Sequence, residues 1–448
     1  MDLLGLLPGF GNLFFTLGAF VVALSVIVAV HEYGHYIVGR WSGIHAEVFS
    51  IGFGPVLFSR VDRRGTRWQV AALPFGGYVK FLGDANAASA ADPAAMSRME
   101  QAERRRSMHG APLWARAATV AAGPAFNFAF SILIFALYML LRGVAADAPQ
   151  LGQVHPLPAP VQQLQQGDLI LAIEGEPTPE LTDFYRVAGE MPAAPVIAYR
   201  VERDGRVMDL QGPHPLPPRA ASVTINSAAR DAGLQVGDVI LAVDDQPVWA
   251  FGELPPIVQA AEGQPLALRI WRPDGGAGQQ LDLLLEPRRT DLPLPEGGFE
   301  TRWLIGLQSG TFFEHPTRRP GLGEVAPAAV GQTWDIVTRS LSGLAHMISG
   351  AISTCNLSGP IGIATTSGAM ASDGIWSFIW FLAVLSTAVG LLNLFPVPVL
   401  DGGHLVFHAW EAVTGKPPSD RALNILMTIG LTLLITLMLF ALLNDILC

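Results

Sequence analysis

The sequence predicts a polytopic α-helical membrane protein with four transmembrane helices, a membrane-associated β-hairpin or sheet, and two similar α+β domains on the outer side of the membrane. Two observations carry this prediction. Four segments long enough to cross a bilayer contain no Asp, Glu, Lys or Arg, and the long stretch between the second and third contains an internal repeat. The chain is 50% hydrophobic and only 15% charged, but its 34 prolines and 47 glycines are too many for membrane helices alone.

The four uncharged segments are the predicted membrane spans. They cover residues 11–30, 117–141, 374–400 and 422–443. The first lacks the basic flank and cleavage site of a signal peptide, so we expect it to be retained. Residues 345–363 are less apolar and are interrupted by glycine and proline, which favours an interfacial or re-entrant segment.

The first span ends in His31-Glu32-Tyr33-Gly34-His35. Histidines four residues apart lie on one face of a helix and can reach a single zinc ion, and the glutamate beside them is a candidate general base. Ionisable groups at membrane depth are costly and are usually functional. The motif therefore predicts a metal site at the end of the first span.

A third ligand is expected near the end of the third predicted span. There the chain reads Asn393-Leu-Phe-Pro-Val-Pro-Val-Leu-Asp401-Gly-Gly-His404. The prolines break the helix and free backbone carbonyls, which membrane proteins tolerate where the backbone lines a cavity or is buried. Zinc bound by two histidines needs a third protein ligand, and from the residues alone Asp401 and His404 are rivals for that place.

Charge sets the predicted orientation. Residues 36–116 hold eleven Lys or Arg against six acidic residues, and Lys416 and Arg421 lie in the short loop between the third and fourth spans. Basic loops face the cytoplasm, so both chain termini and the acidic segment 142–373 should lie outside, in a periplasm if the organism has one. The predicted metal site would then lie near the cytoplasmic face.

The outer segment contains the internal repeat. Gly167-Asp-Leu-Ile-Leu-Ala-Ile recurs seventy residues later as Gly237-Asp-Val-Ile-Leu-Ala-Val, and each copy has a later strand and a turn. This signature resembles PDZ domains of the circularly permuted bacterial type, which bind extended peptides by strand addition. The first copy lacks the usual lead-in, which it replaces with Val154 to Pro160, so the pair could read peptides or act as a steric cap.

Residues 46–83 favour strands over helix. We expect strands at 48–51, 56–61, 66–73 and 78–82, with a turn at 62–65. Directly after the zinc motif, such a sheet could hold an extended peptide by edge pairing, and Gly76 and Gly77 would let a backbone approach closely. The alternative is an ordinary cytoplasmic hairpin.

Together, the His31–His35 and Asn393–Gly403 motifs resemble those of the site-2 protease family of intramembrane zinc metalloproteases. The four-span layout with two PDZ-like domains resembles a bacterial branch of that family, and residues 49–54, 74–80 and 122–127 support the match. The resemblance implies one Zn²⁺ held by His31, His35 and Asp401, Glu32 as catalytic base, and Asn393 as a substrate-binding residue.

The same resemblance implies a hydrolase of the bacterial inner membrane that acts in a stress response. Its substrates would be single-span membrane proteins, such as an anti-sigma factor already trimmed by an upstream site-1-type protease, or remnant signal peptides. The PDZ-like domains would gate access. We expect a monomer, no nucleic-acid partner and, with only Cys355 and Cys448 in the chain, no structural disulfide.

Two other functions are compatible with parts of the sequence. A noncatalytic membrane scaffold would bind partners through its PDZ-like domains and keep zinc for structure, but structural zinc sites usually have four protein ligands. A metal transporter would need neither the base nor the peptide-binding modules.

The predicted order of domains follows from these observations. It is: first transmembrane helix with the zinc motif, 1–45; β element, 46–83; cytoplasmic linker, 84–112; second transmembrane helix, 113–143; first PDZ-like domain, 150–213; second PDZ-like domain, 214–290; outer linker with amphipathic or interfacial helices, 291–373; third transmembrane helix with the Asp motif, 374–410; fourth transmembrane helix, 421–443.

Overall fold

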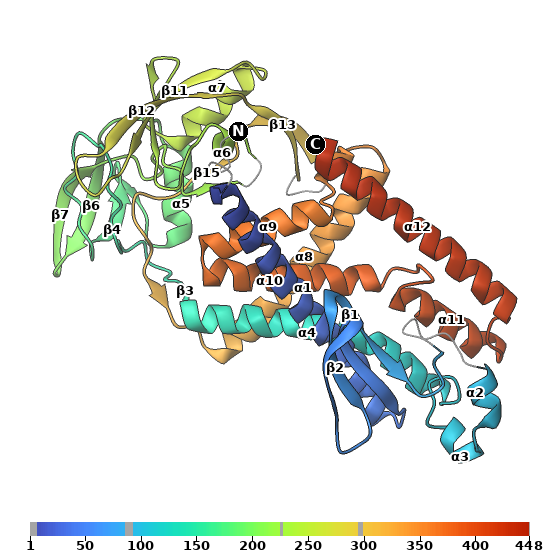
Figure 1. The fold of residues 1–448 in the computed structure, drawn as a ribbon. Coiled ribbons are helices and arrows are strands. Elements are labelled where there is room, and N and C mark those ends of the chain that lie inside the picture. Colours follow the sequence, from blue (N-terminus) through green and yellow to red (C-terminus); the bar gives the residue numbers. More distant parts are fainter. Residues whose placement is uncertain (1–6, 86–92, 225–226, 294–298, 448) are drawn as a thin grey trace. The chain divides into compact units, whose positions relative to one another are not determined.

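The computed structural model describes residues 7–85, 93–224, 227–293 and 299–447. The chain forms two compact units (Figure 1). The first unit holds residues 1–138, 321–347 and 353–448, and the second holds residues 139–320 and 348–352.

The first unit is mostly helical. Its elements are α1 (Leu7–Trp41), β1 (Ala46–Val61), β2 (Arg67–Phe81), α2 (Pro93–Arg98), α3 (Gln101–Arg104), α4 (Leu113–Arg142), α8 (Leu322–Ile348), the short 3-10 turn η2 (Thr354–Asn356), α9 (Pro360–Asp373), α10 (Ile375–Asn393), α11 (Asp401–Thr414) and α12 (Asp420–Leu447).

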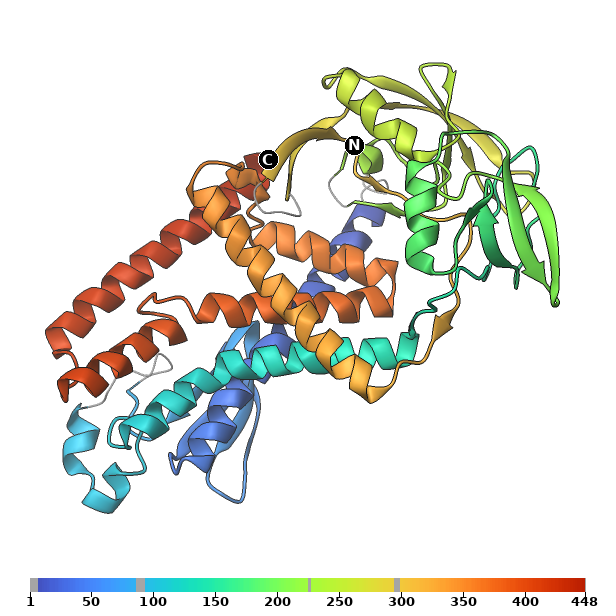
Figure 2. The ribbon, with the colours of Figure 1, turned by 180° about the vertical axis from the view of Figure 1, so that it is seen from behind.

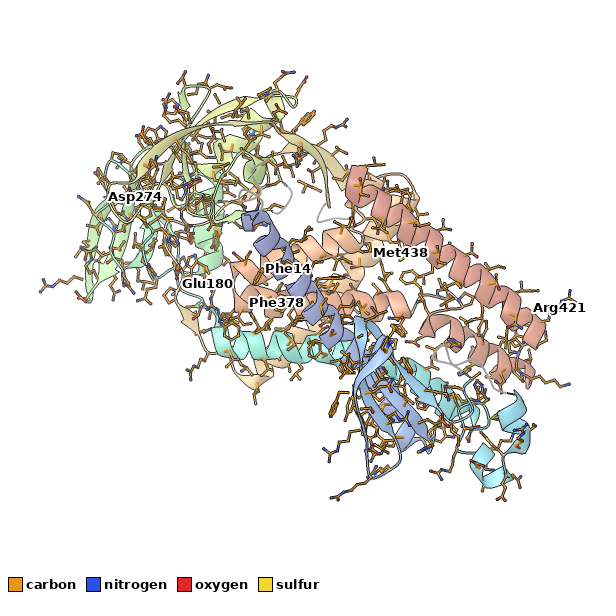
Figure 3. All side chains as sticks on the ribbon, viewed as in Figure 1. Phe14, Glu180, Asp274, Phe378, Arg421 and Met438 are labelled. Carbon is orange, nitrogen blue, oxygen red and sulfur yellow. The ribbon has the colours of Figure 1, made fainter. Side chains whose placement is uncertain are left out.

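Four helices in the described part of the chain are long and apolar enough to cross a membrane. They are Leu13–Trp41, Leu113–Arg142, Ile375–Asn393 and Arg421–Leu447. Helix α1 contacts α9 and α10, and Phe378 of α10 packs against the Ala23–Ile27 side of α1 (Figure 3). The predicted number of candidate spans is therefore found among these residues.

The third predicted span is shorter than expected. Helix α10 ends at Asn393, and residues 394–400 form turns before α11 begins at Asp401. The cause is Pro396 and Pro398, which lack the N–H groups that a continuing helix needs.

Around the predicted re-entrant stretch 345–363, α8 ends at Ile348, and the 14-residue helix α9 begins at Pro360. Helix α8 covers the amphipathic stretch predicted within the outer linker. Its buried Ala329 packs with Phe135 of α4 and Ala383 of α10, and the helix runs across both of these helices (Figure 2).

The β element consists of two long strands, β1 and β2, in place of four short ones. Each bends, so that segment 46–51 pairs with 77–81 on one side and with 67–70 on the other, and 67–71 also pairs with 56–61. The four predicted strand segments are thus present. Segment 56–61 is a free edge whose apolar side chains are open to the surroundings, with Leu57 71% and Phe58 65% exposed.

The predicted cytoplasmic linker, residues 84–112, is partly packed. The buried Asp84 carboxylate accepts from Phe81 N–H and lies 3.0 Å from His109 Nε2. Met108 and Ala111 join a core with Tyr36 of α1 and the β element. This packing fixes the β element against the C-terminal end of α1.

The second unit contains two domains of the same topology, which we call the first and second repeat domains. The first has sheet order β5-β4-β6-β7 and the second β10-β9-β11-β12. Buried Asp168 and Asp238 each form a two-armed ion pair with Arg203 and Arg272, respectively. The elements are β3 (Val144–Ala145), β4 (Leu169–Ile173), β5 (Glu176–Pro177), α5 (Leu181–Glu190), β6 (Ile197–Arg203), β7 (Arg206–Gly212), β8 (Ser222–Val223), α6 (Ala228–Asp231), β9 (Val239–Val243), β10 (Gln246–Pro247), the 3-10 turn η1 (Phe251–Glu253), α7 (Leu254–Ala260), β11 (Leu266–Arg272), β12 (Gln279–Leu285), β13 (Arg288–Pro293), β14 (Phe299–Leu304), β15 (Leu307–Gln308) and β16 (Thr317–Arg318).

One stretch after the second repeat domain closes both domains in turn. We call residues 304–318 the closing segment. Its β15 pairs with β8 of the second domain, and Phe312 and Phe313 then enter the core of the first domain, where Phe313 bridges to Val154. The structure therefore adds a segment distant in sequence to the first repeat domain.

The prediction of no disulfide is wrong in this structure, because Cys355 is disulfide-bonded. Cys448, which lies outside the described residues, is the only other cysteine in the sequence. Cys355 lies in η2. Asn444 near the end of α12 donates to the Thr354 carbonyl, so η2 and the end of α12 are close in space. Composition alone cannot reveal such proximity.

Candidate metal centre

Three side chains predicted as ligands converge in the first unit. His31 Nε2 and His35 Nε2 lie 3.1 Å apart, and Asp401 Oδ2 lies 3.1 Å from the first and 3.4 Å from the second. One ligand atom from each residue lies within 4.8 Å of the others. Helix α1 supplies both histidines because their four-residue spacing places them on one face, and α11 supplies Asp401 at its first residue.

The chemistry of this cluster fits a cation. Asp401 Oδ2 is buried and, although close to two imidazoles, makes no hydrogen bond of acceptable geometry within the described residues. A buried carboxylate oxygen without a partner is costly unless a positive charge meets it. Two imidazole nitrogens and one carboxylate form the three-ligand set of catalytic zinc sites, which keep a fourth position open.

Asp401 reaches the histidines because the chain turns tightly before α11. Gly402 and Gly403 line the inside of this turn, and a Cβ at these positions would lie 2.2 Å from the Leu394 carbonyl oxygen and 2.3 Å from that of Val397. Only glycine fits at such distances. His404, the rival ligand in the sequence, does not belong to the metal-ligating cluster.

Helix α4 supplies three contacts to the histidines that the sequence did not predict. His35 Nδ1 lies 2.8 Å from the Thr119 carbonyl oxygen, and His31 Nδ1 lies 3.2 Å from the amide of Asn127. A Cβ added to Gly123 would lie 2.3 Å from His35 Nε2. Gly123 and Asn127 stood in the supporting motif 122–127, but contacts between helices cannot be read from one helix alone.

Glu32 lies beside the β element. A Cβ added to Gly77 of β2 would come 3.3 Å from Glu32 Cγ and 2.7 Å from the Ser50 carbonyl oxygen. A Cβ on Gly76, whose φ is +143°, would lie 2.4 Å from the Phe53 ring. Both glycines therefore let other parts of the chain come close to the backbone of β2. That they contact substrate stays a prediction.

Asn393 lies at the last residue of α10 and is partly buried. Its Nδ2 donates to the Val389 carbonyl at 3.0 Å, one turn earlier in the same helix. This contact is typical of an asparagine that bonds back to its own helix. Its predicted role in substrate binding is not tested by this geometry.

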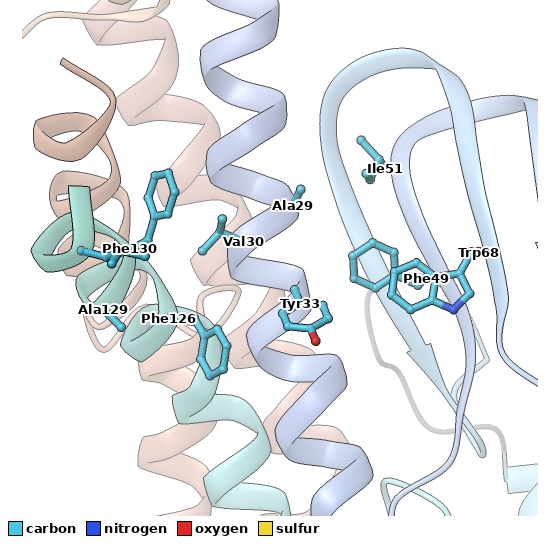
Figure 4. A pocket seen from close by; sticks show the side chains of 10 residues that line it. Ala29, Val30, Tyr33, Phe49, Ile51, Trp68, Phe126, Ala129 and Phe130 are labelled. Atoms are coloured by element: carbon cyan, nitrogen blue, oxygen red, sulfur yellow. The ribbon is translucent and has the colours of Figure 1, made fainter. Parts of the chain in front are cut away.

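An apolar pocket of about 510 Å³ lies beside the zinc-motif helix (Figure 4). Helix α1, helix α4 and the β element form its walls, and Tyr33 is the neighbour of Glu32 on α1. The pocket can hold an apolar group next to the motif. Its lining residues are Ala29, Val30, Tyr33, Phe49, Ile51, Trp68, Phe126, Ala129, Phe130 and Leu133.

Comparisons with known proteins show which family the chain resembles. The sequence profile of peptidase family M50 matches residues 19–437. The chain is 35% identical to the regulator of sigma-E protease of Salmonella typhimurium, over 97% of this chain and 99% of that protein. It is 34% identical to the protein of that name from Escherichia coli, over 96% and 98% of the two chains. It is also 36% identical to a protein named as a zinc metalloprotease in Agrobacterium fabrum, over 95% and 94%.

Proposed function

Because the chain belongs to peptidase family M50 and is a zinc metalloprotease, we propose that it cuts peptide bonds within the transmembrane segments of single-span membrane proteins. The observation that carries the proposal is the cluster of His31, His35 and Asp401, because both histidines and the adjacent Glu32 lie on a helix apolar enough to span a bilayer. A protease built at membrane depth has substrate helices as its nearest targets.

The proposed chemistry assigns a role to each residue. His31, His35 and Asp401 hold the metal, and zinc, when bound, acts as a Lewis acid toward water and the peptide carbonyl. Glu32 takes the proton from the attacking water and delivers it to the leaving amine. The Asn393 amide would offer a hydrogen bond to the substrate backbone, in exchange for its bond to Val389.

A substrate helix must unwind before it can be cut, since its carbonyls are engaged in hydrogen bonds within the helix. The β element offers a way to hold the unwound chain. Segment 56–61 is a free apolar edge, and segment 77–81 lies against α1 next to Glu32. Strand addition at this sheet would keep the substrate backbone extended.

We propose that the repeat domains, which resemble PDZ domains, restrict access by their bulk. PDZ domains that bind peptides by strand addition need free main-chain groups at a strand edge. In the second domain, the Gln259 amide of α7 bonds both the N–H and the carbonyl of Trp303 in β14. In the first, Tyr185 of α5 lies 3.0 Å from His315 Nε2 of the closing segment. These contacts favour a role as a steric gate and not as peptide-binding domains.

The proposed location is the bacterial inner membrane, with both termini and the repeat domains in the periplasm. The basic residues of 36–116 support a cytoplasmic position for that segment. The disulfide at Cys355 supports an oxidising compartment for the opposite side. An upstream site-1-type protease, a trimmed anti-sigma factor as substrate, a role in stress response and a monomeric state belong to the same proposal.

The test is Glu32→Gln in membranes that contain a single-span substrate already trimmed on its outer side. Cleavage should stop while zinc content stays normal, because the amide cannot accept the proton of water. Glu103→Gln, an exposed change in the cytoplasmic segment, is the matched control and should cleave normally. Undiminished cleavage by Glu32→Gln contradicts the mechanism, and full complementation by this variant would favour the scaffold instead.

The gate needs a separate experiment. Replacing residues 144–320 with a flexible Gly/Ser linker removes both repeat domains together with the closing segment. The variant should cut untrimmed substrates that the intact protein leaves alone. If it fails to cut a trimmed substrate, the domains do more than restrict access and the gate proposal is wrong.

A further inference from the structure

Asn127 is a buried polar residue on α4 whose amide lies against the metal cluster. Its side chain is 0% exposed, and its amide nitrogen is placed 3.2 Å from His31 Nδ1. Its amide oxygen is also buried and has no hydrogen-bond partner within the described residues. An unpaired buried acceptor is unfavourable, so this orientation of the amide is not the one that the surroundings favour.

The chemistry of His31 points to the opposite orientation. Its Nε2 faces His35 and Asp401, so a metal held there requires a lone pair on Nε2 and places the ring proton on Nδ1. A protonated Nδ1 is a donor and needs an acceptor, whereas an amide NH₂ is a second donor. Amide oxygen and nitrogen have nearly the same shape, and their assignment rests on the hydrogen-bond network.

We propose that Asn127 is a positioning residue whose amide oxygen accepts a hydrogen bond from His31 Nδ1–H. This inference rests on the zinc-dependent function proposed above. This bond holds the ring in the tautomer that leaves Nε2 free for zinc. His35 is already held in this way, because its Nδ1 meets the Thr119 carbonyl, which can only accept. Helix α4 then supplies one acceptor to each of the two imidazoles.

The surroundings hold Asn127 in place for this role. Ser131 on the same helix and Ser386 on α10 both donate hydroxyl hydrogen bonds to the Asn127 carbonyl, at 3.0 and 3.1 Å. A Cβ added to Gly390 of α10 would come 3.1 Å from Asn127 Cβ. The close contact and the two hydrogen bonds fix the start of the side chain, so the amide has little freedom other than the half-turn that exchanges its two ends.

The test measures the zinc dissociation constant of the full-length protein in detergent, by competition with a chelator, for three variants. Asn127→Leu keeps the approximate size and removes the acceptor, and it should weaken zinc binding by about 10- to 100-fold, the usual effect of losing such a partner. Asn127→Asp has only acceptor oxygens, and it should bind zinc at least as tightly as the original protein. Thr387→Val, which removes another buried polar group of the same bundle, is the control and should bind zinc normally.

Two results overturn the inference. One is normal zinc affinity in Asn127→Leu, and the other is a loss in Asn127→Asp, since an amide that donates to Nδ1 cannot be replaced by a carboxylate. If Asn127→Leu does not fold, the Asp variant alone decides between the two orientations.

Failure of the proposed function gives a different pattern. If the unaltered protein binds no zinc, or if His31→Ala retains it fully, the metal centre itself is wrong. If the unaltered protein binds zinc and cleaves but Asn127→Leu keeps its zinc affinity, only the role of Asn127 is wrong.

Discussion

Gly123 of α4 gives the sharpest test of how the metal centre is packed. A Cβ at this position would lie 2.3 Å from His35 Nε2, 2.5 Å from His35 Cε1 and 2.8 Å from His31 Cε1. All three distances are far shorter than any real carbon contact. Gly123→Ala therefore requires at least one imidazole to move away from the position in which it faces Asp401.

The expected magnitude follows from two opposing effects. In the interior of a helix, alanine is favoured over glycine by about 1 kcal/mol, which stabilises the zinc-free protein. Forcing one extra methyl group into a packed site costs about 1–3 kcal/mol, and this cost is largest when the rings must hold the metal geometry. At about 1.4 kcal/mol per factor of ten, zinc affinity should fall by roughly 10- to 100-fold.

The assay is zinc affinity by chelator competition, together with the melting temperature of the zinc-free protein. Gly123→Ala should lose zinc affinity and keep or slightly raise the zinc-free melting temperature. Gly331→Ala on α8 is the matched control, because a Cβ there meets nothing within 4 Å. Zinc affinity equal to that of the original protein would refute the packing that we describe.

Three further predictions follow from other contacts. Glu411→Gln should weaken the attachment of α11 to α4 by about 1–3 kcal/mol in thermal unfolding, because it breaks a two-armed pair with Arg116 at 3.0 and 2.6 Å. Asp238→Asn should destabilise the second repeat domain by about 1.5–3 kcal/mol in denaturant unfolding, since the partly exposed Arg272 loses its charge-assisted hydrogen bonds to the buried carboxylate. Burial lowers the pKa of His214 below its ordinary value of 6.5, so unfolding takes up a proton and the stability of the repeat domains should fall as pH decreases below about 6.5; in His214→Gln this part of the pH dependence should disappear.

The parts of the site that the sequence predicted are those carried by local rules. His31 and His35 share a helix face because of their spacing, and the two prolines before Asp401 break the preceding helix. Both deductions need only neighbours along the chain. The contacts from Thr119, Gly123 and Asn127 depend on how α4 packs against α1, which no local pattern specifies.

The fold shows the same division. Four apolar stretches and two repeated strand patterns were readable from composition and periodicity, whereas the length of the third helix depended on two prolines within an otherwise apolar run. The disulfide at Cys355 depends on which chain segments meet, and a count of two cysteines gives no information about that. The register of the β element is similar, since β1 and β2 each bend and pair twice.

The closing segment, residues 304–318, has the largest consequence for the gate. The sequence repeat predicted two domains that end at residue 290, but Phe312 and Phe313 are both buried in the core of the first domain, and β15 completes the second. A fragment of residues 144–290 therefore lacks a strand partner for each domain and two large core side chains, each worth about 3–5 kcal/mol when removed. It should fail to unfold cooperatively in a thermal melt, whereas a fragment of residues 144–320 should do so. If the shorter fragment melts as sharply as the longer one, the closing segment is not needed to complete the two domains.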